Sequence, residues 1–108
     1  MKELSIILPT YNEKDNIIIL VNKIIKILKN YQKEEIIIVD DLSPDNTYKL
    51  VKEKFRKKKF VKVFLRKKDC SLAKSIGFGI NKSRGQFIIV MDTDFTHNPN
   101  LIKKLIYY

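Results

Sequence analysis

Apolar residues are arranged along this chain in two alternating ways. Largely apolar, β-rich runs occur at residues 4–8, 36–39, 60–65 and 87–91, interrupted only by Ser5 and Lys62, and each predicts a buried strand. Between them, apolar residues recur every three or four positions, which predicts helices over about 15–29, 47–55 and 71–82. We expect Pro9 to end the first strand, Arg84-Gly85 to stop the third helix, and a last short helix to begin after Pro99.

The strict strand–helix order indicates the fold class. Strands that are apolar throughout, rather than alternating, are typical of a parallel sheet covered on both faces. We therefore predict an α/β fold: an open, mostly parallel sheet with helices on both faces. The 108 residues suit one domain, 1–108. Because the sequence stops soon after its last helix signal, we expect this domain to be truncated at the carboxyl end.

The chain carries a formal net charge of +10, from 22 Lys and Arg against 12 Asp and Glu. Such an excess favours anionic partners, although an Ile-, Lys- and Asn-rich composition accounts for it equally well. The densest basic runs, 56–59 and 66–68, are not interleaved with aromatic residues, so nucleic acid is not the expected partner.

Nothing in the sequence predicts export or a membrane span. No apolar run reaches the roughly 18 to 20 residues that a bilayer requires, and no cleavable secretory pattern follows Met1. The single cysteine, Cys70, cannot form a disulfide within the chain. We therefore expect a cytoplasmic protein.

Polar clusters follow three of the four predicted strands. They are Pro9-Thr10-Tyr11-Asn12-Glu13, Asp40-Asp41-Leu42-Ser43 and Asp92-Thr93-Asp94. Because the carboxyl ends of parallel strands open on one edge of a sheet, these acidic side chains should converge there. Carboxylates gathered in this way repel one another unless a cation compensates.

The spacing of Asp92 and Asp94 suits a divalent metal. Aspartates at i and i+2 in an extended segment point to the same side, and carboxylates hold Mg²⁺ or Mn²⁺ with positions open for phosphate oxygens. A nucleotide diphosphate is then a natural ligand. The alternative, from spacing alone, is that both aspartates start a turn and cap the helix after Pro99.

Several other functional classes fit poorly. The chain has no GxxxxGK[ST] loop, and Gly77-Phe78-Gly79 lies inside a predicted helix rather than after a strand. His97 is the only histidine and no nucleophile elbow is present, which disfavours a Ser or Cys nucleophile. Asp40-Asp41 suggests a receiver domain, but there the acidic pair should follow the first strand.

Three stretches, in order, resemble one enzyme family. "LSIILPTYNEKDNI", "EIIIVDDLSPDNT" and "SLAKSIGFGINKSRGQFIIVMDTDFTHNP" look like the amino-terminal, donor-binding half of a family 2 glycosyltransferase of GT-A fold. The resemblance is greatest to the polyprenyl-phosphate (dolichol-phosphate) mannosyltransferase branch, and it runs from Leu4 to Leu105. It implies inverting transfer of a sugar from a nucleotide-diphospho-sugar, GDP-mannose-like, to a polyprenyl phosphate.

The resemblance also implies roles for individual residues. The base and ribose of the donor would be held by Pro9, Tyr11, Glu13, Val39 and Asp41. Asp92 and Thr93 would face the sugar nucleotide, and Asp94 would hold a Mg²⁺ or Mn²⁺ ion that bridges the diphosphate. Thr96 stands where a residue often assists the metal, but its hydroxyl is a weaker ligand than a carboxylate.

The sequence departs from the family at two places. Asn46 stands where these enzymes usually have Gly, although Asn tolerates a left-handed backbone. Asp69-Cys70-Ser71 replaces a glycine-rich entry to the third helix.

Alternatives to this interpretation stay open. They are a non-catalytic nucleotide-binding remnant or interaction module, a family 2 enzyme with a different acceptor, and a basic nucleic-acid-binding domain. The family resemblance leaves room for peripheral contact with the cytoplasmic face of a membrane.

Overall fold

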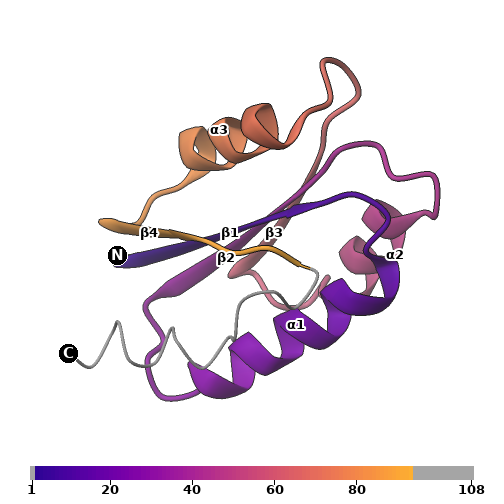
Figure 1. Cartoon of the computed structure of the whole chain (residues 1–108). Coiled ribbons are helices and arrows are strands. Elements are labelled where there is room, and N and C mark those ends of the chain that lie inside the picture. Colours follow the sequence, from indigo (N-terminus) through magenta and orange to yellow (C-terminus); the bar gives the residue numbers. More distant parts are fainter. Residues whose placement is uncertain (1, 94–108) are drawn as a thin grey trace.

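Strands and helices alternate along the whole described chain, as the sequence predicts (Figure 1). The structure is a computed structural model that describes residues 2–93. Its elements are β1 (Leu4–Thr10), α1 (Lys14–Ile27), β2 (Glu34–Asp40), α2 (Thr47–Lys54), β3 (Val61–Leu65), α3 (Leu72–Lys82) and β4 (Phe87–Val90). The helix predicted after Pro99 lies outside the described residues.

The four strands form one parallel sheet in the order β3-β2-β1-β4. The chain therefore builds outward from β1 to β3 and then returns past β1 to place β4 on its other side. α1 and α2 pack together on one face of the sheet, whereas α3 packs on β1 and β2 from the other face (Figure 1). This arrangement confirms the predicted open α/β sheet with helices on both faces.

The two faces of the sheet bury separate apolar clusters. Alternate residues of β1 and β2, such as Ile6 and Ile36, pack beneath α1 and α2, while Ile7, Ile37 and Val39 face α3. Each fully buried aliphatic side chain contributes about 1.5 to 3 kcal/mol. On the α3 side, a Cβ at Gly79 would lie 2.6 Å from Cγ2 of Ile7, so a glycine there lets the helix approach the sheet closely.

β1 extends two residues beyond its predicted end. The expectation that Pro9 ends the strand was wrong, because Pro9 pairs with Val39 and Thr10 with Asp40. Residues of a parallel strand point their N–H and C=O groups alternately to the two neighbours, and the carbonyl of Pro9 faces β4. The ladder with β4 has ended there, at Ile7 and Val90, so the missing N–H of proline removes no strand bond.

A buried carboxylate ties the α3–β4 turn to the sheet. Glu35 on β2 is fully buried and accepts hydrogen bonds from Oγ of Ser5 (2.6 Å), Nζ of Lys62 (2.9 Å) and the backbone N–H of Arg84 (2.5 Å). The N–H of Gly85 donates in turn to Oγ of Ser5 at 2.8 Å. A Cβ on Gly85 would lie 2.7 Å from the backbone nitrogen of Ser5, so only glycine fits this close approach.

β4 is an edge strand within the described residues. Among residues 2–93 its only strand partner is β1, through four residue pairs. Its apolar side chains are unusually exposed, with Phe87 68%, Ile88 41% and Val90 37% accessible to solvent. Within the described part of the chain, this edge therefore combines backbone groups that pair with no further strand and exposed apolar side chains.

Among residues 2–93, no helix is both long enough and apolar enough to span a membrane.

We expect the Glu35 contacts to make stability depend on pH. Burial raises the pKa of Glu35, but the hydrogen bonds from Ser5, Lys62 and Arg84 outweigh it and lower the pKa below its ordinary 4.5. A lowered folded pKa gives stability that is present above pH 4.5 and is lost as the pH falls through the folded pKa. Glu35→Gln should therefore cost about 2 to 3 kcal/mol in urea unfolding at pH 7, and the deficit should shrink in acid.

Glu53→Gln serves as the matched control, because the Glu53 side chain is 72% exposed in its pair with Arg56. It should change stability by less than about 0.5 kcal/mol. A constant difference between wild type and Glu35→Gln from pH 7 to pH 3 would argue against the linkage.

Candidate functional site

The predicted polar clusters of β1, β2 and β4 meet at the carboxyl edge of the sheet, where the strand order reverses. Thr10 pairs with Asp40 across β1 and β2. On the other side of β1, Oγ1 of the buried Thr93 donates to the carbonyl of Pro9 at 3.3 Å. The structure thus brings the ends of these three strands together, as the sequence predicts.

Asp40 is committed to internal hydrogen bonds. It is buried, and its Oδ1 accepts from Oγ1 of Thr10 at 2.7 Å and from Oγ of Ser43 at 2.5 Å. Its Oδ2 accepts the backbone N–H of Ser43 at 2.9 Å, and Oγ of Ser43 accepts the N–H of Asn12 at 2.9 Å. Asp40 therefore fixes the β1–α1 and β2–α2 loops relative to each other.

Asp41, directly after β2, forms an ion pair that no sequence pattern predicted. Nη1 of Arg66 lies 3.0 Å from Oδ1 of Asp41, with only 13% of the arginine side chain and 9% of the aspartate side chain exposed. The same guanidinium donates to the carbonyls of Lys68 and Asp69, each at 3.2 Å. Arg66 therefore links Asp41 to the β3–α3 loop.

Tyr11 and Glu13 lie on the β1–α1 loop at this edge. Tyr11 is 57% exposed, so its ring is accessible to a ligand. Glu13 starts α1: its carbonyl accepts the N–H of Ile17 at 2.8 Å, and its carboxylate accepts from Nδ2 of Asn16 at 3.1 Å. Val39, by contrast, is fully buried in the apolar cluster on the α3 side, so it supports the floor of this edge.

Of the residues predicted near the metal, the structure describes only Asp92. Asp92 is half-buried just beyond β4, whereas Asp94, Thr96 and His97 lie outside the described residues. Among residues 2–93, no three or more His, Cys, Asp or Glu side chains are grouped so as to hold a metal ion. The metal site at Asp94 and Thr96 therefore stays a prediction.

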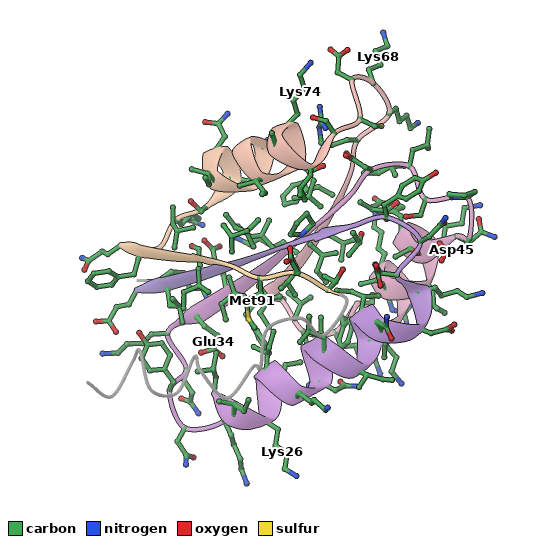
Figure 2. The ribbon with its side chains drawn as sticks, viewed as in Figure 1. Lys26, Glu34, Asp45, Lys68, Lys74 and Met91 are labelled. Carbon is green, nitrogen blue, oxygen red and sulfur yellow. The ribbon has the colours of Figure 1, made fainter. Side chains whose placement is uncertain are left out.

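Asp45 joins the starts of α1 and α2 (Figure 2). Its Oδ1 accepts the N–H of Thr47 at 3.1 Å and the hydroxyl of Thr47, and its Oδ2 accepts the N–H of Lys14 at 3.3 Å. Burial raises the pKa of Asp45, but these hydrogen bonds outweigh it and the net pKa is lowered. The neighbouring Asn46 has a φ of 64°, which confirms the left-handed turn expected there.

Backbone strain is concentrated at the same edge. Leu42 has a φ of 55° and a side chain that is 50% exposed. A left-handed backbone is unfavourable for leucine, because its Cβ approaches the following carbonyl oxygen. Most of the described non-glycine residues with positive φ lie in the loops after the strands: Asn12, Leu42, Asn46 and Asp69, with Gln32 at the opposite edge.

The sequence is similar to known families and proteins. The family described as glycosyl transferase family 2 matches residues 5–108. The chain is 40% identical over 106 residues to a dolichol-phosphate mannosyltransferase of Pyrococcus furiosus, covering 96% of this chain and 29% of that protein. It thus spans about a third of that relative's length.

Solved structures show the same fold. TarS residues 1–349 of S. aureus in complex with UDP-GlcNAc superimposes with a TM-score of 0.82 at 29% identity, over 97% of this chain and 30% of that one. The mannosyltransferase PcManGT of Pyrobaculum calidifontis, in complex with GDP-Man and Mn²⁺, superimposes with a TM-score of 0.81 at 20% identity, over 95% and 31% of the two chains.

Leu42→Asn should stabilise the protein by up to about 1 kcal/mol, because asparagine adopts the left-handed backbone more readily than leucine. Chemical denaturation measures this change. Leu50→Asn is the control: Leu50 is similarly exposed (41%) but lies within α2, where asparagine should be neutral or slightly destabilising. Equal effects at the two positions would show that the backbone conformation of Leu42 costs nothing.

Arg66→Gln should destabilise the fold by about 2 to 4 kcal/mol, because it leaves the carboxylate of Asp41 largely buried without its charge partner. Amide hydrogen exchange should also speed up in the β3–α3 loop, since two carbonyl contacts are lost. Lys74→Gln is the control: Lys74 pairs with Asp69 at 3.6 Å with 57% of its side chain exposed, and exposed pairs contribute little. Similar losses for both variants would contradict the assignment.

Proposed function

Because the chain belongs to glycosyl transferase family 2, we propose that it binds the nucleotide-diphospho-sugar donor of an inverting glycosyltransferase whose acceptor is a polyprenyl phosphate. The observation that carries this proposal is the meeting of three polar strand ends at the reversal of strand order. In open α/β sheets this position is where nucleotides bind.

The proposed donor site has two sides, one for the base and ribose and one for the diphospho-sugar. The base and ribose would contact the loop after β1, with Pro9, Tyr11 and Glu13, and the end of β2, with Asp41, while the buried side chain of Val39 would support this surface from beneath. The exposure of Tyr11 and the fixed position of Asp41 beside Arg66 support these roles. Asp92 and Thr93 would face the diphospho-sugar from the end of β4.

Mg²⁺ or Mn²⁺ fits the chemistry of the proposed phosphate end. Asp94 would hold the ion with help from Thr96, and Asp92 stands two residues before Asp94 in the sequence. Carboxylates are ligands that both ions prefer. When bound, the metal neutralises negative charge on the nucleoside diphosphate leaving group. PcManGT, which shares the fold, is in complex with both GDP-Man and Mn²⁺.

The proposed acceptor needs no base from this chain. A polyprenyl phosphate oxygen is already anionic, so it attacks the anomeric carbon without first losing a proton, from the face opposite the leaving diphosphate. The dolichol-phosphate mannosyltransferase of P. furiosus supports a lipid phosphate. The net charge of +10 favours such an anion and contact with the cytoplasmic face of a membrane.

The metal role is tested by calorimetry with GDP and GDP-mannose, with and without Mn²⁺. Asp94→Asn should weaken binding in Mn²⁺ by at least about tenfold, a loss of about 1.4 kcal/mol, and should change binding without metal far less. Asp69→Asn is the matched control, because the Asp69 side chain is 76% exposed on another loop.

Mn²⁺-dependent donor binding that is unchanged in Asp94→Asn would contradict the metal role. Transfer to a polyprenyl phosphate is a separate assay. Donor binding without transfer would favour a non-catalytic nucleotide-binding module, and transfer to another acceptor would retain the family but change the substrate.

A further inference from the structure

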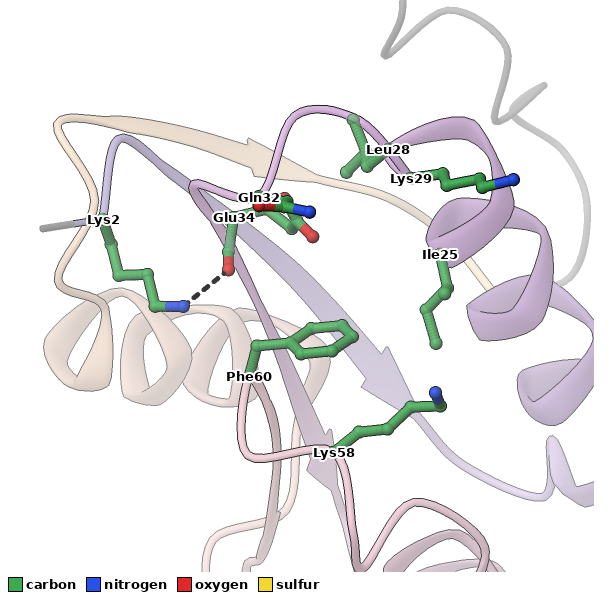
Figure 3. Close-up of a pocket in the computed structure, with 8 residues that line it drawn as sticks. All are labelled: Lys2, Ile25, Leu28, Lys29, Gln32, Glu34, Lys58 and Phe60. Carbon is green, nitrogen blue, oxygen red and sulfur yellow. Dashed lines mark hydrogen bonds between the residues drawn. The ribbon is translucent and has the colours of Figure 1, made fainter.

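We infer a second small-molecule site at the amino edge of the sheet, on the opposite side of the molecule from the proposed donor site. A hollow of about 310 Å³ lies between the end of α1 and the starts of β2 and β3 (Figure 3). It is lined by Lys2, Ile25, Leu28, Glu34, Lys58 and Phe60, among others. Its size falls at the lower end of the range for ligand pockets, about 300 to 1,000 Å³.

The carboxylate of Glu34 is the unexplained group in this hollow. Glu34 is only 7% exposed, and within the described part of the chain its buried Oε2 has no hydrogen-bond partner. The nearby Nζ of Lys2 donates to the backbone carbonyl of Glu34 at 3.0 Å, and the carboxylate oxygen Oε2 receives no hydrogen bond from it. Lys33 is engaged with Glu3 at 3.6 Å. A buried oxygen without a partner is costly, so this one calls for a hydrogen-bond donor from outside the chain.

The remaining walls combine apolar surface with positive charge. Ile25, Leu28 and Phe60 supply aliphatic and aromatic faces, while Figure 3 shows Lys58 extending toward the hollow from the side opposite Glu34. Lys58 also lines a neighbouring hollow with Lys59 and other basic residues. The rim of the hollow is therefore positively charged, and it surrounds the buried carboxylate oxygen of Glu34.

The buried carboxylate, the lysines and the apolar side chains together favour one class of ligand. An ammonium group would satisfy Glu34 but would be repelled by the surrounding lysines, whereas a hydroxyl donates to the carboxylate without that cost. The lysines favour an anionic group at the rim, and the ring of Phe60 suits the C–H face of a carbohydrate. The ligand is a small phosphorylated sugar or polyol, with hydroxyls toward Glu34 and phosphate toward Lys58.

The site is tested with glucose 6-phosphate as the probe, in a titration of the full chain followed by the NMR signal of the Ile25 methyl group. Saturable shifts are expected, and glucose or inorganic phosphate alone should bind at least about tenfold more weakly because each carries half of the recognised chemistry. Asp92→Asn, in the proposed donor site, should leave this binding unchanged.

Variants of residues in and beside the hollow distinguish a loss of ligand binding from a loss of folding. Glu34→Gln and Lys58→Gln should each weaken the probe several-fold, whereas Lys57→Gln, on the same turn but not lining the hollow, should have no effect. Lys58 is exposed, so its variant remains informative even if Glu34→Gln fails to fold.

Three results would overturn the proposal. The first is no saturable shift of Ile25, which would mean that water or a rotated Lys58 satisfies Glu34. The second is tighter binding of phosphoethanolamine than of glucose 6-phosphate, which would show that the site selects a cation. The third is equal loss of binding in Lys57→Gln and Lys58→Gln, which would indicate diffuse attraction of anions by the surface.

Discussion

The placement of β4 depends on the hydrogen bonds that the carboxylate of Glu35 accepts. β4 joins the sheet through only four residue pairs, and it follows α3, which packs on the face of the sheet opposite α1 and α2. Glu35 and Ser5 hold the backbone of Arg84 and Gly85 just before the strand begins. Thr93 is held to Pro9 just after it ends. Since Asp92 lies between these two attachments, the geometry of the proposed donor site is set partly from the opposite edge of the sheet.

The two adjacent aspartates at the end of β2 hold different parts of the edge. Asp40 is the last residue of the strand, and Asp41 follows it. Asp40 turns toward hydroxyls and joins two loops, whereas Asp41 turns toward Arg66 and joins the third. The edge is thus held together by polar contacts before any ligand arrives, and Leu42 between Asp41 and Ser43 carries backbone strain as a result. Preorganisation of this kind reduces the ordering that a ligand must impose.

The sequence predicted the fold better than it predicted the site contacts, and the reason is physical. Apolar runs and helical spacing are local signals, so the order of strands and helices followed from them. Arg66 and Glu35 gave no such signal, because their partners lie 25 to 49 residues away and a charged side chain in a strand usually faces solvent. Pro9 predicts a strand end because proline lacks the N–H that a strand ladder uses. That N–H matters only where a neighbouring strand still needs it, and here the ladder with β4 has already ended. The convergence of the strand-end clusters was predictable because parallel topology alone requires it.

The exposed side of β4 has a consequence for the behaviour of the chain in solution. A strand edge that is both apolar and unpaired is a template onto which another strand can add. Phe87, Ile88 and Val90 would give such an addition hydrophobic contacts as well as backbone hydrogen bonds. Among the described residues nothing pairs with this outer edge of β4, so any segment that covers it would remove a surface for self-association as well as extend the sheet.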